Sequence, residues 1–268
     1  MAQSSAIATA DAPDGDDYLP TFPLRVKPVT ALVAAFRLLL NKEDTKQMLV
    51  IVDAIDGPTH ERNYRRFQTT PGGRRMVDDE VDFSIILMKK EPLRACPPGS
   101  LGAAYMEFTD AEHFDAGDLA IAEQQSNARM LRVEPSRRRF IASGIALHDI
   151  WHVLAGYGRD ALGEACVLAF TATQAQTIGV GVFAFLLAVR EQFMFPRVPV
   201  MRCYFEARRI AKAAEWLPAQ DWRRLFEQPL QSVRDELHLR RPTLYECYAA
   251  QVREADKYRR AKLAAAQA

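Results

Sequence analysis

The sequence predicts an all-α protein with a single helical domain. Apolar residues recur at helical spacing through most of the chain, almost no stretch alternates apolar and polar residues over more than four positions, and no internal repeat is present. Of the 268 residues, 49% are apolar and 26% are charged, which is ordinary for globular proteins and excludes a disordered or fibrous chain. We expect one domain over residues 28–248, between an acidic tail at 1–27 and a charged helix or tail at 249–268.

The first half of the chain contains five segments that we predict to be helices. Apolar spacing and helix-forming residues define them, and Asp56-Gly57-Pro58 is expected to stop the second because proline cannot continue a helix. The predicted helices are Val29–Leu40, Thr45–Ile55, Glu61–Thr69, Arg74–Leu87 and Leu101–Phe108.

The second half is predicted to be helical from Ser136 to Phe195, with breaks at Gly156, Gly158 and Gly163. Between the two halves, residues 110–135 are polar and irregular, and we expect only short helices there. Three further helices are predicted at Tyr204–Trp216, Trp222–Phe226 and Pro229–Leu237.

Charge and cysteine content exclude several classes of protein. The net charge is +1, from 35 basic and 34 acidic residues, and the basic residues are dispersed. The protein therefore has no overall positive potential that would bind a nucleic acid. The four cysteines form no C-x-x-C pair and are interpreted as reduced thiols of a cytosolic protein. Residues 1–24 contain four aspartates and no arginine, so we expect neither a secretory signal nor a mitochondrial transit peptide.

The uncharged stretch from Ala165 to Val189 is long enough to be a candidate membrane span. Five threonine and glutamine residues between Thr171 and Thr177 argue against a span, because polar side chains at the bilayer centre are costly. The strongly apolar part, Ile178–Val189, has the length of a buried core helix. We predict a buried helix that can line an apolar groove.

A metal-binding pattern lies in His148-Asp149-Ile150-Trp151-His152. On a helix, positions i and i+4 lie one turn apart on the same face, and Asp149 is about 100° round from His148. Two imidazoles and a carboxylate suit zinc, iron or manganese. The alternative is a pair of core histidines hydrogen-bonded to Asp149.

Glu164 is the candidate that completes this site. On one continuous helix it would lie roughly 18 Å from His152, too far to share an ion. Gly156 and Gly158 can reverse the chain, and a second helix starting near Asp160 would bring Glu164 back. The alternative is that Glu164 is a helix cap or a solvated side chain.

The pattern excludes two familiar metal sites. A zinc metalloprotease needs glutamate directly after the first histidine, where this chain has the shorter Asp149. A di-iron bundle needs two helices that each carry Glu-x-x-His, and this chain has neither.

The motif H-D-x-x-H, followed after eleven residues by Glu164, resembles the hallmark of the fourth family of coenzyme Q (ubiquinone) biosynthesis proteins. The resemblance extends over roughly residues 28–246, through Asn41–Gly57, Pro97–Tyr105, His148–Phe170 and Trp222–Leu237. Two features depart from that family: the mitochondrial leader of its eukaryotic members is missing, which favours a bacterial member, and His238 stands where we expect glycine.

The resemblance implies that His148, Asp149, His152 and Glu164 are metal ligands and catalytic residues. It implies a divalent cofactor, with zinc favoured over iron, manganese or magnesium. It implies a role in ubiquinone synthesis, as an oxidative decarboxylase that replaces the carboxyl group of a polyprenylated hydroxybenzoate with a hydroxyl. The alternative is a non-catalytic lipid-binding scaffold that organises the biosynthetic enzymes.

The resemblance also implies the partners and the location. We expect the partners to be the polyprenylated quinone precursor, the other ubiquinone biosynthetic enzymes, a membrane surface and a second copy of the chain, and no nucleic acid. We expect the protein on the inner face of a bacterial cytoplasmic membrane, attached peripherally.

Five further residues are candidates for substrate binding. Tyr157 and Arg159 lie in the loop predicted to close the metal site, where they can contact substrate or only pack the loop. Phe170, Phe183 and Phe185 follow Glu164 along the apolar stretch, and we expect them to line a groove for the prenyl tail. The alternative is that these three rings belong to an ordinary core.

Overall fold

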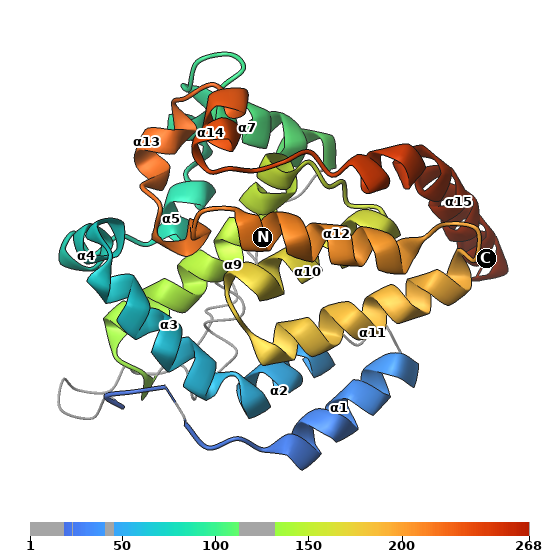
Figure 1. Cartoon of the computed structure of the whole chain (residues 1–268), viewed down its shortest axis with the longest axis horizontal. Helices are drawn as coiled ribbons and strands as arrows, with labels where there is room; N and C mark the ends of the chain where they lie inside the picture. The colour runs from blue at the N-terminus through green and yellow to red at the C-terminus, as the bar shows by residue number, and fades with distance from the viewer. Residues whose placement is uncertain (1–18, 23, 41–45, 113–131, 268) are drawn as a thin grey trace, which may run out of the picture.

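A computed structural model describes residues 19–22, 24–40, 46–112 and 132–267 of the protein (Figure 1). Within these ranges the chain forms fourteen α-helices, one short 3-10 helix and only isolated β-bridges, so the predicted all-α class is confirmed. The helices are α1 (Pro28–Leu40), α2 (Lys46–Ile55), α3 (Gly57–Thr69), α4 (Pro71–Asp78), α5 (Phe83–Met88), α6 (Lys90–Arg94), α7 (Leu101–Glu112), α9 (Pro135–Ala155), α10 (Ala161–Gln174), α11 (Ile178–Met194), α12 (Val200–Ala213), η2 (Leu217–Ala219), α13 (Trp222–Phe226), α14 (Leu230–Glu236) and α15 (Thr243–Gln267).

Helices α9 and α10 lie at the centre of the arrangement (Figure 1). Helix α10 packs against α9, α11, α12 and α15, while α3, α5, α7 and α14 pack against α9. The pair formed by α1 and α2 lies outside α11. The two helices predicted to carry the metal ligands are therefore held from several sides.

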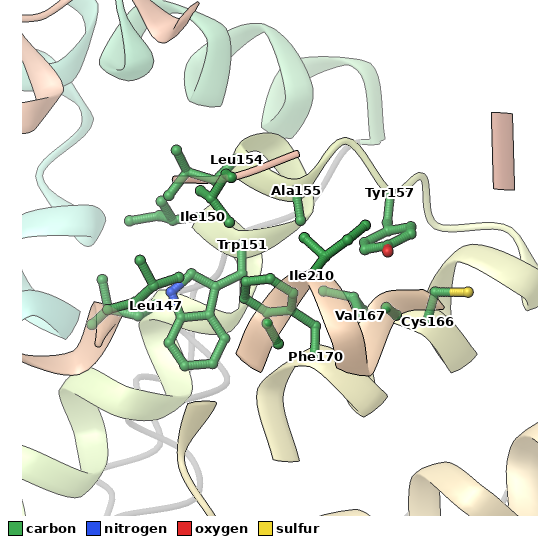
Figure 2. Close-up of a cluster of buried hydrophobic side chains, with 14 of the residues drawn as sticks. Leu147, Ile150, Trp151, Leu154, Ala155, Tyr157, Cys166, Val167, Phe170 and Ile210 are labelled. Carbon is green, nitrogen blue, oxygen red and sulfur yellow. The ribbon is translucent and has the colours of Figure 1, made fainter. Parts of the chain in front are cut away.

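The main core fills the space around α9 and α10 (Figure 2). Trp151 of α9 is 1% exposed, and its ring meets that of Phe170 on α10 with centroids 6.0 Å apart. Ile210 of α12 packs into the same cluster. Burying a large apolar side chain contributes about 1.5–3 kcal/mol, so these contacts fix the backbone on which the histidines stand.

Several predicted helices differ from the observed ones: α7 extends to Glu112, and α12 runs from Val200 to Ala213 rather than from Tyr204 to Trp216. The second helix ends at Ile55 as expected, but the third begins at Gly57 rather than Glu61, because proline at position 58 is compatible with the first turn of a helix. The predicted helix Arg74–Leu87 is two helices, α4 and α5, separated near Glu80, whose φ is +52°.

The uncharged stretch is also divided. It forms α10 and α11, and Gln176 between them has a φ of +50°. Within the described ranges, no helix is both long and apolar enough to cross a membrane. Helix α11 buries Gly179, Ala184 and Ala188, but it leaves Ile178 and Phe185 58% and 44% exposed. The prediction of a buried helix is therefore wrong for one face of α11, because α2, α10 and α12 cover only the others.

Two predicted regions fall partly or wholly outside the described residues. The polar segment 110–135 is described only to Glu112 and from Arg132, and the acidic tail only from Leu19 onward. At the other end, α15 runs to Gln267, so the charged C-terminal segment is a helix rather than a tail.

A buried carboxylate fixes the start of α11. Asp56 follows α2, is 0% exposed, and accepts hydrogen bonds from the backbone N–H groups of Ile178 (2.7 Å) and Gly179 (2.8 Å). Burial raises the pKa of Asp56, although these backbone hydrogen bonds oppose the rise. The first free N–H groups of α11 are thus satisfied across the interface with α2.

We expect His238→Gly to stabilise the protein. His238 has a φ of +55°, and this left-handed conformation costs a non-glycine residue about 1–2 kcal/mol, against roughly 0.5–1 kcal/mol for the greater backbone entropy of glycine. The contact of His238 with Glu215 (3.4 Å) is exposed and adds little. Thermal unfolding should show a Tm raised by a few degrees, and His238→Ala, which loses the imidazole but keeps the strain, should not. A lower Tm for His238→Gly would contradict this account.

Candidate metal centre

Three side chains from two helices meet in one group. His148 and His152 on α9 and Glu164 on α10 each offer a ligand atom, and these atoms all lie within 4.8 Å of one another. Nε2 of His152 is 3.7 Å from Oε2 of Glu164. The chain reversal therefore brings Glu164 beside the two imidazoles, as the glycine hypothesis expected.

The reversal begins at the end of α9. Gly156 ends the helix with a φ of +78°, a conformation that glycine adopts without steric cost, and the N–H groups of Gly156 and Tyr157 both donate to the carbonyl of His152. Asp160 then starts α10, where its carboxylate accepts from the N–H of Gly163 at 3.0 Å.

A close backbone contact makes the reversal tight. A Cβ atom on Gly163 would lie 2.0 Å from the carbonyl oxygen of Gly158, so only glycine lets the first turn of α10 sit against the loop. Since Glu164 is the next residue, this contact determines how near its carboxylate comes to α9.

Hydrogen bonds orient both imidazoles. Nδ1 of His152 lies 3.1 Å from the carbonyl oxygen of Tyr157, which can only accept, so Nδ1 carries the proton and Nε2 faces Glu164. Nδ1 of His148 is 2.9 Å from the hydroxyl of Thr171, which leaves Nε2 free for an ion. The two rings meet edge to face, with centroids 5.1 Å apart.

Burial and mutual contact shift the pKa values of the three clustered residues. Burial lowers the pKa of His148 to about 4, with His152 adding to the shift, so His148 is neutral. Burial opposes charge on both His152 and Glu164, but their mutual contact outweighs it and raises the pKa of His152 while lowering that of Glu164. Without an ion, their contact therefore favours a charged pair across the helices.

Asp149 stands apart from the three clustered ligands. It is 8% exposed, and burial raises its pKa to about 6, with the charge of His152 opposing the shift. The structure does not bring its carboxylate into the group formed by His148, His152 and Glu164.

The predicted loop residues lie beside the site in different ways. Tyr157 is 2% exposed, and its ring packs on that of Tyr245. Its hydroxyl has no hydrogen-bond partner among the residues that the structure describes. Its contribution to the site is its backbone carbonyl, which accepts a hydrogen bond from His152. Arg159 reaches the opening, where its Nε is 3.6 Å from Oε1 of Glu164 and both side chains are about one-third exposed.

The structure does not bring the three predicted groove phenylalanines together. Phe170 is fully buried in the main core against Trp151. Phe183 packs on the small cluster between α1 and α2. Phe185 lies at the surface beside Tyr204, with ring centroids 6.0 Å apart.

Two residues at the site were not among the predicted ones. Phe108 of α7 stacks on the ring of His152, with centroids 5.6 Å apart and planes 25° apart. No sequence pattern links it to the motif. Thr171 could have been predicted from the sequence, because it follows Glu164 by seven residues and so lies on the same face of α10.

The comparison with protein families settles the relationship. The model of the family described as coenzyme Q (ubiquinone) biosynthesis protein Coq4 matches residues 20–243. The chain belongs to the Coq4 family. The predicted family is therefore confirmed, whereas a bacterial origin stays a prediction.

Several known members resemble the chain at modest identity. The human ubiquinone biosynthesis protein COQ4 homologue is 24% identical over 228 residues, which are 85% of this chain and 83% of the human protein. The bovine homologue is 25% identical over 174 residues, 65% of this chain and 63% of the bovine protein. The matched part thus spans less than two thirds of the bovine protein.

A solved structure shares the fold of this Coq4 member. A crystal structure of a protein from Nostoc punctiforme, provisionally assigned to ubiquinone biosynthesis, superposes with a TM-score of 0.57 at 18% identity. The match covers 79% of this chain and 98% of that one.

We expect Gly163→Ala to open the metal centre. The added Cβ would overlap the carbonyl oxygen of Gly158, so α10 must move away from the loop, at a cost of about 1–3 kcal/mol. Zinc affinity, measured by competition with a chelator, should fall at least tenfold. Gly144→Ala on α9 is the matched control, because no atom lies within 4 Å of its added Cβ, and it should leave affinity unchanged. Equal affinity in both variants would contradict the role given to the contact.

We expect metal affinity to fall as the pH is lowered, by about tenfold per pH unit below the raised pKa of His152. That pKa lies above 6.5, while His148 is neutral down to about pH 4, so below the raised pKa of His152 one proton is displaced per ion. Zinc titrations between pH 8 and 5.5, or calorimetry in two buffers of different ionisation enthalpy, measure the displaced proton.

Folding of the metal-free protein should show the opposite dependence. The contribution of His152 to stability is complete below pH 6.5 and is lost as the pH rises through its raised value. Affinity that is constant from pH 8 to 5.5 would exclude the charged pair.

Proposed function

We propose that this Coq4 member catalyses a metal-dependent oxidative decarboxylation in ubiquinone synthesis, which replaces the carboxyl group of a polyprenylated hydroxybenzoate with a hydroxyl. The observation that carries the proposal is the group of His148, His152 and Glu164 between α9 and α10, to which the described residues contribute three ligands and in which His148 and Glu164 are partly exposed. Catalytic metal sites keep three protein ligands and an open position, whereas structural sites are closed by four.

The residues fit a divalent ion. Both imidazoles present a ring nitrogen away from their hydrogen-bonded Nδ1, and such support from outside the ligand shell is typical of metal-binding histidines. Glu164 supplies a carboxylate whose lowered pKa keeps it ionised. Two histidines and one carboxylate are ligands of zinc hydrolases and also of non-haem iron oxygenases.

The oxidative step bears on the choice of ion. Breaking the carbon–carbon bond releases carbon dioxide, and forming the new carbon–oxygen bond requires an oxidant that accepts two electrons. Zinc has no redox chemistry, so the proposed reaction favours iron or manganese over the zinc that the motif first favoured, with dioxygen as the oxidant to test. Elemental analysis of the purified protein decides between them.

The chain's own residues account for orientation and charge. When bound, a divalent ion held by His148, His152 and Glu164 would supply Lewis-acid chemistry at the substrate carboxylate. Arg159 at the opening offers a positive charge for the same carboxylate. Phe108, stacked on His152, offers an aromatic face to the substrate ring.

A surface on α1 and α11 supports attachment to lipid. Its exposed apolar side chains are Val29, Leu32, Val33 and Phe36 on α1 and Ile178, Val182 and Phe185 on α11. The two helices contact each other; α1 lies at the lower edge of the molecule, and α11 lies between α1 and α12 (Figure 1). Exposed basic residues stand beside α1 at Arg25, Lys27 and Arg37, as in helices that lie on anionic membranes. We propose that this face meets the membrane from which the prenylated substrate arrives; the inner face of a bacterial membrane, the homodimer and the partner enzymes stay predictions.

A second candidate function is a lipid-binding scaffold without catalysis. The contact between His152 and Glu164 joins α9 to α10, and an ion there would brace the two helices. In that case the metal stabilises the fold, and the apolar face on α1 and α11 recruits membrane and partner enzymes.

We expect Glu164→Gln to abolish turnover while the protein stays folded. The purified, iron- or manganese-loaded protein receives a short-tailed prenyl hydroxybenzoate with an isotope-labelled carboxyl group, together with dioxygen, and labelled carbon dioxide is measured. Release should fall at least about 100-fold, because removing a ligand costs more than removing its supporting hydrogen bond. Glu254→Gln, the same change at an exposed position of α15, is the control.

The two candidate functions give different results. Labelled carbon dioxide from the native protein and the control, but not from Glu164→Gln, supports the enzyme. A metal-loaded native protein that binds the substrate and releases no carbon dioxide would leave only the scaffold.

A further inference from the structure

The hydroxyl of Tyr245 lies inside the loop that presents Glu164. It accepts a hydrogen bond from the N–H of Gly158 at 2.8 Å and donates one to Oδ2 of Asp160 at 2.7 Å. We infer that Tyr245 is a positioning residue for the metal centre, which sets the place of Glu164 relative to the two histidines. The inference rests on the metal centre of the proposed function and assigns it a support from the C-terminal helix.

Tyr245 is itself held firmly. It stands in the first turn of α15, where the carboxylate of Glu206 on α12 accepts from the N–H of Leu244 and the hydroxyl of Thr243, each at 3.0 Å. Its side chain is buried, and its ring meets that of Tyr157 with centroids 5.2 Å apart. Burial and the nearby Asp160 raise the pKa of Tyr245, so the phenol keeps its proton and can donate.

Asp160 connects Tyr245 to α10, the helix that carries Glu164. One oxygen of its carboxylate accepts from Tyr245, and the other accepts from the N–H of Gly163 at 3.0 Å. Its backbone carbonyl accepts from the N–H of Glu164 at 2.9 Å. Both carboxylate oxygens are thus used, and the orientation of Asp160 is fixed from outside α10.

Tyr245 also holds the other side of the tight backbone contact. Gly158, whose N–H it accepts, is the residue whose carbonyl oxygen touches Gly163. Farther along α15, Asp256 accepts from the N–H of Ala161 at 3.0 Å. Helix α15 is therefore hydrogen-bonded to the loop through Tyr245 and to the start of α10 through Asp256. Both residues lie beyond the family match at residues 20–243.

Removing the Tyr245 hydroxyl removes the group that is hydrogen-bonded to both Gly158 and Asp160. In Tyr245→Phe the ring packing remains, but the N–H of Gly158 and an oxygen of Asp160 lose a partner inside the protein. The start of α10 then moves relative to α9, and Glu164 no longer completes the ligand group. Loss of such supporting contacts lowers metal affinity by about 10–100-fold.

The test is a double-mutant cycle on the full chain, with zinc affinity and the visible spectrum of the cobalt-loaded protein as readouts. Tyr245→Phe should bind zinc about 10–100-fold more weakly, and its cobalt spectrum should shift toward that of Glu164→Gln. In the Glu164→Gln background, adding Tyr245→Phe should change affinity less than about threefold, since the residue it acts through is gone. Tyr258→Phe, at an exposed position of the same helix, is the control and should match the native protein.

A second variant guards against a purely structural loss. Asp160→Asn keeps one oxygen to accept from the N–H of Gly163, but its amide nitrogen cannot accept from the Tyr245 hydroxyl. It should show the same loss of affinity and the same dependence on Glu164.

Native affinity in Tyr245→Phe, or a loss that persists in full in the Glu164→Gln background, would overturn the inference. If the native protein releases no carbon dioxide but the cycle behaves as expected, the proposed reaction fails and the positioning role stands. A native protein that binds neither zinc nor cobalt would overturn both.

Discussion

The metal centre depends on one contact between two stretches of backbone. The first turn of α10 rests against the carbonyl oxygen of Gly158, and no residue larger than glycine fits at position 163. The ligand-bearing faces of α9 and α10 can meet only because the chain turns within the five residues between these helices. Every other feature of the site, from the charged pair to the orientation of the imidazoles, follows from that approach.

The surrounding structure leaves few backbone groups at this turn unsatisfied. Arg234 of α14 donates to the carbonyls of Val153 and Leu154, each at 2.9 Å, and so satisfies the end of α9. The carbonyl of Tyr157 serves His152 instead of solvent. The turn is therefore tied to the core through Tyr157 and Asp160, which are buried, while Arg159 stays partly exposed.

The sequence was sufficient for the parts of the structure that local rules determine. Helical periodicity predicted most of the helices, and the spacing of His148, His152 and Glu164, together with the glycines between them, predicted that these three residues meet. A proline such as Pro58 can end one helix or lie in the first turn of the next. Only the structure shows that α2 ends just before Pro58 and that α3 has it in its first turn. The exposed face of α11 could not be foreseen, because composition does not reveal which neighbours cover an apolar helix.

Contacts between distant parts of the chain were beyond sequence reasoning. Phe108 reaches His152 from a separate helix, and Tyr245 reaches the loop from the C-terminal helix, and neither carries a motif. The three phenylalanines predicted to share a groove lie in three different environments, since residues spaced 13 and 15 positions apart on two helices need not face the same way. Asp149 illustrates the same limit, because its position on the helix could not show that its carboxylate stays outside the ligand group.

The separation of Asp160 and Tyr245 by 85 residues has a consequence for synthesis of the protein. At about 5–20 residues per second, the ribosome delivers Tyr245 roughly 4–14 s after the end of α10 at Gln174. During this interval the nascent pair of helices α9 and α10 contains all three ligands, but Tyr245 is not yet available to hold the loop between them. The metal centre therefore reaches its native affinity only after α15 has docked against the loop.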